Sequence, residues 1–291
     1  MSVLDHHLPS KSAATPAMRV AKPHDEFAAT LGLDRDVPLL GGGALLDPVG
    51  IPLALGMEHQ PDLLRAVAHA CRTQVLAGRD WYSHGAVALI GQKGSGRGHA
   101  ARRLAAATGL PLFVVDASTR NGRQLVSGRS APGTSAIPPF AVAAVAASGC
   151  ANPIILVEGL PAGPELAPLL APFVDPDAGC RFGSDVLRAT FDISQINWLL
   201  QIESDAVARR LPEGWASEVR FLDCCGDDRR LLRLSLISAI VEELGGLGVV
   251  RHDALDGAIH DVLHGHLRDL PIGEILARFT TLLSDPAAAA S

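Results

Sequence analysis

Five short runs rich in apolar residues alternate with helical segments along the middle of the chain. A brief apolar run bounded by glycines is typical of a strand that is buried on both faces of a sheet. Strands that alternate with helices predict a parallel sheet with helices covering both of its faces. The sequence therefore predicts an α/β fold with a five-stranded parallel sheet, whose strands occupy residues 86–90, 112–116, 154–157, 195–202 and 219–222.

The composition limits the classes of protein to which the chain can belong. Of its 291 residues, 48% are hydrophobic and 19% are charged, which excludes wholesale disorder. A net charge of −6 argues against a protein that coats nucleic acid. The apolar runs are far shorter than the ~20 residues of a membrane helix, and the first residues lack a signal-peptide pattern. Five scattered cysteines suggest no disulfide framework, so we expect a cytoplasmic protein with no membrane partner.

The chain divides by composition into three regions. Residues 1–50 begin polar and end in a stretch rich in glycine and proline, and we expect them to form a flexible tail and lead-in. Residues 51–226 carry the alternating pattern and form the predicted α/β domain. Residues 227–291 have a helical pattern throughout, which predicts a small helical lid domain.

A glycine-rich loop, Gly91-Gln-Lys-Gly-Ser-Gly-Arg-Gly-His99, joins a predicted strand to a predicted helix. The backbone amides of such a loop, with the helix N-terminus behind them, favour a phosphate. The P-loop pattern G-x-x-x-x-G-K-[ST] fits Gly91 and Gly96, but Arg97 takes the place of the lysine and Gly98 the place of the hydroxyl residue.

Two other interpretations of this loop are open. It could be an ordinary glycine turn between a strand and a helix. It could also be a Rossmann dinucleotide loop, because Gly94 and Gly96 are followed at tolerable spacing by Asp116 at the end of the next strand. The place of the third Rossmann glycine holds His99, and Tyr82 is the only tyrosine, which excludes a Tyr-x-x-x-Lys reductase site.

Three stretches downstream of the loop point to a family. Residues 152–158 read Asn-Pro-Ile-Ile-Leu-Val-Glu, residues 174–176 read Val-Asp-Pro, and residues 182–194 read Phe-Gly-Ser-Asp-Val-Leu-Arg-Ala-Thr-Phe-Asp-Ile-Ser. In this order they resemble the AAA+ ATPase module of Lon-type proteases, over roughly residues 55 to 285. The resemblance implies a P-loop domain with strand order 5-1-4-3-2 followed by a helical lid. The protease domain of that family has no counterpart here.

The resemblance also implies which residues form the nucleotide site. Glu158 falls at the metal-binding aspartate of Walker B and Gly159 at the water-orienting glutamate, whereas a shift of one residue would make Glu158 the catalytic glutamate. Glu158 is therefore the candidate catalytic residue in either alignment. The lid contributes Arg268, because Leu267-Arg268-Asp269-Leu270 resembles the sensor-2 signal. The implied nucleotide-binding residues are Gly91, Gly94, Ser95, Gly96, Arg97, Gly98, His99 and Arg268.

Several parts of the family's machinery are altered. Gly98 offers no hydroxyl to magnesium, the sensor-1 position falls near Glu203 or Ser204, and Ala216 and Glu218 stand where arginine fingers are expected. We therefore expect ATP or ADP to bind over a poor Mg²⁺ site, with hydrolysis impaired or absent. The implied role is regulatory, beside an active AAA+ protein or another assembly. The alternatives are a nucleotide-free scaffold and an atypical but active ATPase that relies on Arg97 and Glu158.

One further cluster carries metal-binding residue types. Asp256, His260 and His264 recur at four-residue spacing on a predicted helix. One face of such a helix could supply ligands to zinc or nickel, or it could be a solvated lid surface.

Overall fold

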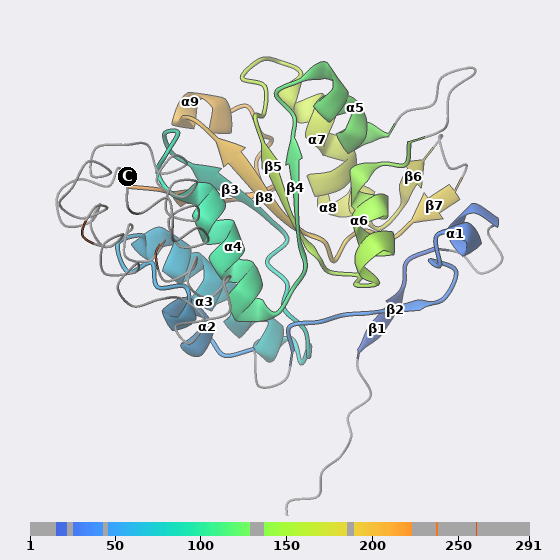
Figure 1. The fold of residues 1–291 in the computed structure, drawn as a ribbon, viewed down its shortest axis with the longest axis horizontal. Coiled ribbons are helices and arrows are strands. Elements are labelled where there is room, and N and C mark those ends of the chain that lie inside the picture. The colour runs from blue at the N-terminus through green and yellow to red at the C-terminus, as the bar shows by residue number, and fades with distance from the viewer. Residues whose placement is uncertain are drawn as a thin grey trace, which may run out of the picture.

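The computed structural model describes residues 16–21, 26–42, 46–128, 137–184 and 189–222, together with Ile237 and His260 (Figure 1). The described part of the chain contains both helices and strands, and helices lie between most strands of the central sheet. Their bounds are β1 (Ala17–Arg19), α1 (Glu26–Thr30), β2 (Asp36–Pro38), α2 (Gly50–Ala54), α3 (Pro61–Leu76), β3 (Ala86–Ile90), α4 (Arg97–Thr108), β4 (Leu112–Asp116), α5 (Arg120–Ser127), α6 (Phe140–Ser148), β5 (Ile154–Glu158), α7 (Leu166–Val174), α8 (Pro176–Gly179), β6 (Phe182–Ser184), β7 (Ala189–Phe191), β8 (Asn197–Ile202), α9 (Asp205–Ala208) and β9 (Ser217–Arg220).

The central sheet has five parallel strands in the order β4-β5-β8-β3-β9. Figure 1 shows β3, β8, β5 and β4 side by side. When the five strands are numbered along the chain, this order reads 5-1-4-3-2 from the β9 edge. The predicted α/β class and five-stranded parallel sheet are therefore confirmed, and the strand order is the one that the resemblance implies.

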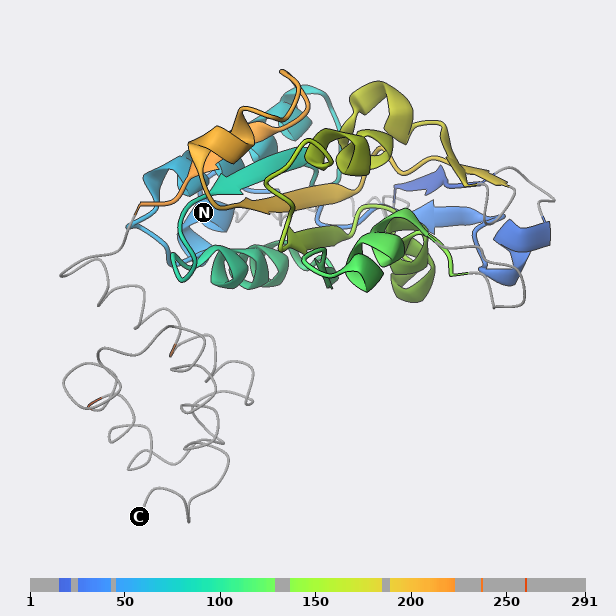
Figure 2. The same ribbon diagram turned by 90° about the horizontal axis from the view of Figure 1, so that it is seen from above.

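Side chains alternate between two apolar cores on opposite faces of the sheet, as the period of a strand requires. On β3, Val87 and Leu89 belong to one core, together with residues of α2, α3 and α4. Ala88 and Ile90 belong to the other core, together with residues of α6, α7 and α9. Figure 2 shows α4 on one side of the sheet and α9 on the other. Because both faces are covered, the sheet holds the loops at its strand ends on a rigid base.

Two buried asparagines join segments that are distant in sequence. The side-chain amide of Asn152 donates to the carbonyls of Leu40 and Tyr82, at 2.9 and 2.8 Å. Asn197, at the start of β8, donates to the Asn152 carbonyl at 2.9 Å. Both asparagines have no exposed surface. They satisfy backbone groups that would otherwise be buried without partners, and so fix where β5 and β8 begin.

Within the expected tail and lead-in, residues 16–21 and 26–42 are described, and they contain two short strands and a helix. Strands β1 and β2 pair antiparallel, and the Asp192 amide donates to the Val20 carbonyl at 2.7 Å. Val20 and Val37 are buried in the same core as α6 and α7. Although this region is polar in composition, a few buried apolar residues anchor the two-stranded sheet of β1 and β2 to the core. The proposed lid, residues 227–291, lies outside the described residues except for Ile237 and His260.

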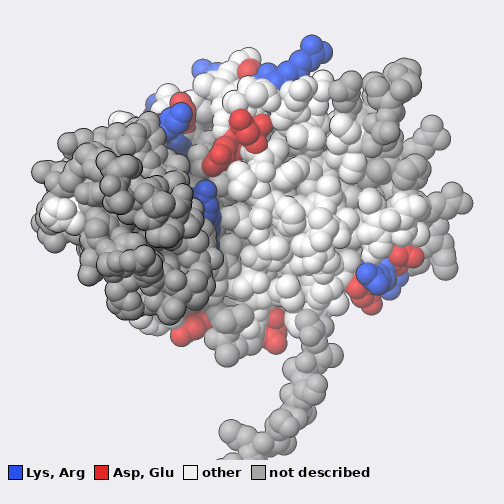
Figure 3. Space-filling model, viewed as in Figure 1, with Lys and Arg blue, Asp and Glu red and all other residues white. Residues whose placement is uncertain are grey.

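Charged side chains are scattered over the described residues of the face drawn in Figure 3. On the face drawn in Figure 3, the described Lys and Arg side chains are scattered and form no broad patch. Among the described residues, no helix is both long enough and apolar enough to cross a membrane.

Candidate functional site

The glycine loop lies at the carboxyl end of β3 and leads directly into α4. Gly94 and Gly96 have φ of +89° and +93°, values that side-chain-bearing residues rarely adopt. Gly96 precedes Arg97, the first residue of α4, so the loop turns sharply and presents the N-terminus of a twelve-residue helix at this edge. This is the backbone arrangement in which helix-end amides and the helix dipole attract an anion.

The loop also contains a buried hydroxyl group. Ser95 is only 5% exposed, and its Oγ has no hydrogen-bond partner within the described part of the chain. The amide of Ser95 donates to the Gln92 carbonyl at 3.2 Å. This oxygen is itself almost fully covered, so it does not face a ligand placed on the loop.

Arg97 does not extend from the loop into solvent. Its Nη1 donates to the Ile202 carbonyl at 2.7 Å and, more weakly, to the Leu89 carbonyl at 3.5 Å. The residue is 5% exposed, and burial lowers the pKa of the guanidinium, while the nearby carboxylates of Glu203 and Glu158 oppose that shift. The side chain at the lysine position therefore ties the loop to the ends of β3 and β8.

Glu158 ends β5 and lies beside both α4 and β8. Its Oε1 accepts a hydrogen bond from Gln201 Nε2 at 2.9 Å. A Cβ built on Gly98 would lie 3.5 Å from the same Oε1 and 3.6 Å from Gln201 Nε2, which is ordinary van der Waals contact. Three positions far apart in sequence therefore meet at the carboxyl ends of β3, β5 and β8.

Gln201 is the residue of this site that the sequence analysis missed. The resemblance placed the sensor-1 position near Glu203 or Ser204, but both of these residues are exposed. Alternation along β8 sends Trp198, Leu200 and Ile202 to one face and Gln201 to the other, where it reaches Glu158. A polar residue one position before the end of a buried strand was the available signal.

Gly159 has a backbone that an ordinary residue does not fit. Its φ is +62°, and a Cβ built on it would lie 2.5 Å from Asp116 Oδ1 and 2.7 Å from Ser118 Cβ. Position 159, which would carry the water-orienting carboxylate, therefore has no room for a side chain, because the turn that follows β4 occupies the space.

The sheet order excludes the Rossmann interpretation of the loop. In a Rossmann fold the second strand pairs with the first, which brings its terminal acidic residue close to the ribose. Here β8 and β5 separate β3 from β4, a distance of about 14 Å at the usual strand spacing. The carboxylate of Asp116 instead accepts from the Ser118 amide at 2.8 Å, and hydrogen bonds from Ser118 lower its pKa.

His99 lies in the first turn of α4 and is 4% exposed. Burial, together with the charges of Arg103 and Arg102, lowers the pKa of its imidazole to about 4. His99 is therefore neutral near pH 7 and adds no positive charge to the loop.

The arginine-finger segment ends in an ion-paired arginine. Arg220 Nε contacts Asp205 Oδ1 at 3.1 Å, and its Nη2 contacts Glu218 Oε2 at 2.7 Å. Arg220 is exposed at the end of β9, so it is held on this chain's own surface by two carboxylates.

The remaining predicted residues lie mostly outside the described part of the chain. Arg268, Asp256 and His264 belong to this group, whereas His260 is described and exposed. Within the described ranges, no group of three or more His, Cys, Asp or Glu side chains could hold a metal ion.

The donor set suits a phosphate better than a magnesium ion. Backbone amides of the loop and of the start of α4 can donate to phosphate oxygens. For magnesium, the carboxylate beside Gly98 is that of Glu158, which already accepts from Gln201, and Gly98 itself supplies no hydroxyl. Magnesium prefers carboxylate, hydroxyl and phosphate oxygens in near-octahedral geometry, so this site would hold it poorly.

Comparison with known proteins does not assign the chain to a family. No protein-family model matches the chain, and a search of curated proteins finds no significant match.

An Arg97→Met variant is expected to be less stable than the parent protein by about 2–3 kcal/mol, because it removes a charged hydrogen bond to a buried carbonyl. Arg102→Met is the matched control, since Arg102 is exposed on the same helix. That variant should stay within about 0.5 kcal/mol. Urea unfolding measures both, and equal stabilities would show that the Arg97 contact with Ile202 contributes nothing.

Proposed function

We propose that this chain is an AAA+-type P-loop protein, similar to the ATPase module of Lon-type proteases. In this proposal it binds ATP or ADP at the loop Gly91–Gly98 and hydrolyses it negligibly. The observation that carries the proposal is the position of the loop, between β3 and α4 at the carboxyl edge of a parallel sheet with strand order 5-1-4-3-2. Ligands of open α/β sheets bind at this edge, where the strand order reverses.

The contacts around Glu158 support its place within the site. Its proximity to Gly98 favours the alignment with Glu158 at the metal-binding carboxylate, because that carboxylate and the hydroxyl position serve the same ion. In this alignment Gly159 stands at the water-orienting position, and neither its backbone nor its surroundings accept a glutamate. The proposed activity is therefore nucleotide binding, in a regulatory or adaptor subunit that joins an active AAA+ protein or another assembly.

A nucleotide-free scaffold is the second candidate, and the hydrogen bonds of Arg97 favour it. A P-loop lysine is needed on the phosphates, whereas Arg97 donates to the carbonyls of Ile202 and Leu89. If that arrangement persists, the loop is stabilised from within and has no need of a ligand.

Isothermal titration calorimetry with ATP and ADP, with and without magnesium, separates these functions. We expect both nucleotides to bind, with affinities that change little when EDTA removes magnesium, because Gly98 supplies no metal ligand. Absence of heat with either nucleotide would favour the scaffold. Magnesium-dependent phosphate release that Glu158→Ala abolishes would instead establish the atypical ATPase.

A further inference from the structure

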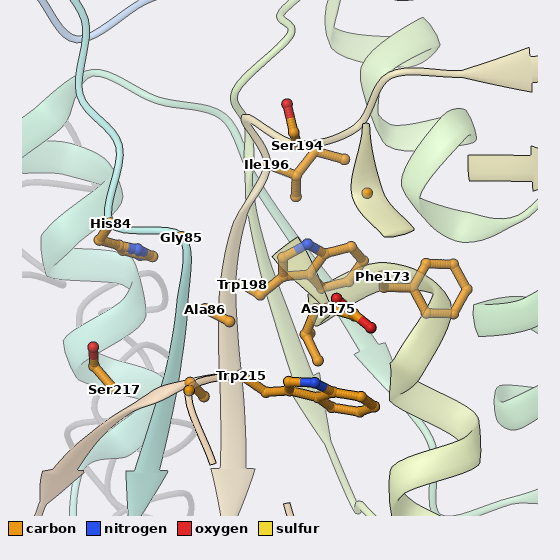
Figure 4. Close-up of a pocket in the computed structure, with 14 residues that line it drawn as sticks. His84, Gly85, Ala86, Phe173, Asp175, Ser194, Ile196, Trp198, Trp215 and Ser217 are labelled. Carbon is orange, nitrogen blue, oxygen red and sulfur yellow. The ribbon is translucent and has the colours of Figure 1, made fainter. Parts of the chain in front are cut away.

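Strand β9 connects the two edges of the central sheet. It begins at a cavity of about 370 Å³, where Figure 4 shows Ser217 of β9 together with Ala86 of β3 and Trp198 of β8. From there β9 pairs on one side with β3, as the last strand in the order of the described sheet. Its final bond to β3 runs from the Phe221 amide to the Ile90 carbonyl, at 2.7 Å. The chain thus leaves the sheet at the edge that carries the glycine loop.

The side chain of Gln60 pairs with the backbone immediately after this last strand bond. Its Oε1 accepts from the Leu222 amide at 2.9 Å, and its Nε2 donates to the Leu222 carbonyl at 3.2 Å. Two residues that face each other in an antiparallel ladder exchange the same two bonds. A primary amide has both a donor and an acceptor, which a carboxylate or an apolar side chain does not. Gln60 therefore acts on residue 222 as a strand partner would.

The position of Gln60 at the start of α3 does not explain its side chain. Gln60 is the N-cap residue of this helix, but its side chain makes no capping bond. Ser, Thr, Asp and Asn are the residues that usually cap. Gln60 has no exposed surface, and burying an amide is costly unless its polar atoms are hydrogen-bonded. The two bonds to Leu222 satisfy both ends of this buried amide.

The segment that Gln60 holds lies directly against the glycine loop. A Cβ built on Gly91 would lie 2.9 Å from Phe221 Cβ and 3.0 Å from Ser95 Oγ. Position 91 therefore cannot carry a side chain unless its neighbours move, and its backbone packs between the end of β9 and Ser95. Phe221 is 6% exposed and belongs to the same apolar core as α3. Because these groups are in close contact, a shift of residues 221 and 222 displaces the start of the loop.

We propose that Gln60 is a positioning residue for the glycine loop, which it holds through the backbone of Phe221 and Leu222 in the conformation that receives phosphates. The part of this inference that concerns the ligand rests on the proposed nucleotide function. The start of α3, the end of β9 and the loop then form one packed unit, although they are distant in sequence. Gln60 acts on the ligand through these residues.

Three variants test the link from both of its sides. Gln60→Met removes both hydrogen bonds and keeps an unbranched side chain of similar length. Gln74→Met is the matched control, because Gln74 is a buried glutamine of the same helix whose Nε2 donates to the Ser83 carbonyl at 2.9 Å, before the amino end of β3. Leu222→Pro removes the amide that donates to Gln60, at a residue that is 52% exposed, so it provides a second test if Gln60→Met does not fold.

Hydrogen exchange followed by NMR measures the loop in the protein without ligand. The amides of Gly91 and Ser95 donate to the carbonyls of Ile202 and Gln92, at 3.0 and 3.2 Å. We expect Gln60→Met and the proline variant to speed exchange at both amides by about tenfold, because the lost hydrogen bonds make local opening easier. The control variant should leave both rates unchanged.

Calorimetry with ADP measures the consequence for binding. We expect Gln60→Met and Leu222→Pro to bind ADP about tenfold more weakly than the parent protein, since the energy of the lost bonds must be restored when the ligand orders the loop. Gln74→Met should keep the affinity of the parent. Thermal unfolding ranks the stabilities of the variants, so an affinity loss that only followed stability would also occur in the control.

Three results would overturn the inference. The first is unchanged exchange at Gly91 and Ser95 in the folded variants, and the second is unchanged ADP affinity in those variants. The third is an equal loss of affinity in Gln60→Met and Gln74→Met. If the parent protein binds no ADP, the proposed function fails, whereas the exchange rates still decide whether Gln60 positions the loop.

Discussion

A Gly159→Glu variant is expected to lose stability and to gain no hydrolysis, although it restores the carboxylate that an ATPase of this type would need. A residue with a Cβ at φ +62° costs roughly 1–2 kcal/mol. The new Cβ would also lie 2.5 Å from Asp116 Oδ1 and 2.8 Å from the Ser118 amide. Overpacking of this kind costs about 1–3 kcal/mol, so the free energy of unfolding should fall by about 2–5 kcal/mol in total.

Alanine substitutions separate the backbone cost from the steric cost. Gly149 has nearly the same φ, +61°, but a Cβ built on it meets nothing within 4 Å. Gly149→Ala should therefore cost about 1–2 kcal/mol, and Gly159→Ala clearly more. Urea unfolding measures the stabilities, and a phosphate-release assay measures hydrolysis. A stable Gly159→Glu protein with magnesium-dependent turnover would contradict this prediction. It would show that the turn after β4 can move to accommodate the new side chain, and it would support the active-ATPase alternative.

Hydrolysis should stay at background for a second reason. Positioning and charge stabilisation supply nearly all of the acceleration in phosphoryl transfer, and a missing arginine finger alone is worth roughly 10³–10⁵ in rate. Ala216 and Glu218 supply no such finger, and Arg220 is paired with carboxylates of its own chain. Catalytic groups of this kind act together, so restoring one of them does not restore hydrolysis while the others are still missing.

The strands and helices could be predicted from sequence where the apolar residues follow a clear strand or helix pattern. The runs at 86–90 and 112–116 coincide with β3 and β4, because short apolar runs that end in turn residues are typical of strands in a parallel sheet. The helix α5 was missed, since Arg120–Ser127 has few apolar residues and depends on the Thr119 cap, whose hydroxyl accepts from the Gly122 amide. The two-stranded sheet of β1 and β2 was missed because each strand has only three residues.

The candidate site was predictable only where the chain itself is continuous. The loop Gly91–Gly98 is one stretch of sequence, so its turn and its helix could be expected. The pairing of Glu158 with Gln201 depends on β5 and β8 being neighbours and in register, with Val157 opposite Leu200. Sequence spacing does not contain that register. The inward fold of Arg97 likewise depends on the Ile202 carbonyl, at the end of a strand more than a hundred residues away in sequence.

Asn152 shows how a family-like motif can also have a structural cause. The Asn-Pro pair before β5 contributed to the resemblance, and the structure gives its asparagine a full set of hydrogen bonds to Leu40, Tyr82 and Cys150. Such a residue is needed wherever a loop brings unpaired backbone groups into the interior. Its presence therefore supports the fold and does not by itself support the nucleotide site.

A Gly96→Val variant is expected to lower nucleotide affinity by roughly 100-fold, which corresponds to about 2.7 kcal/mol. Gly96 has φ +93° and immediately precedes α4, so a β-branched residue must change the backbone at the point where the helix amides face the ligand. Gly94→Ala should have a smaller effect, because its Cβ would meet nothing within 4 Å although its φ is +89°.

The control for Gly96→Val is Gly109→Val at the other end of the same helix, where φ is +67°. It imposes similar backbone strain, so it should lose stability while keeping the affinity of the parent protein for ATP and ADP. Calorimetry on the three variants then distinguishes strain from ligand contact. If Gly96→Val folds and binds as tightly as the parent, the nucleotide does not lie on this loop. If only Gly96→Val loses binding, the phosphates rest on the start of α4, and the glycine at position 96 is there for the ligand as well as for the turn.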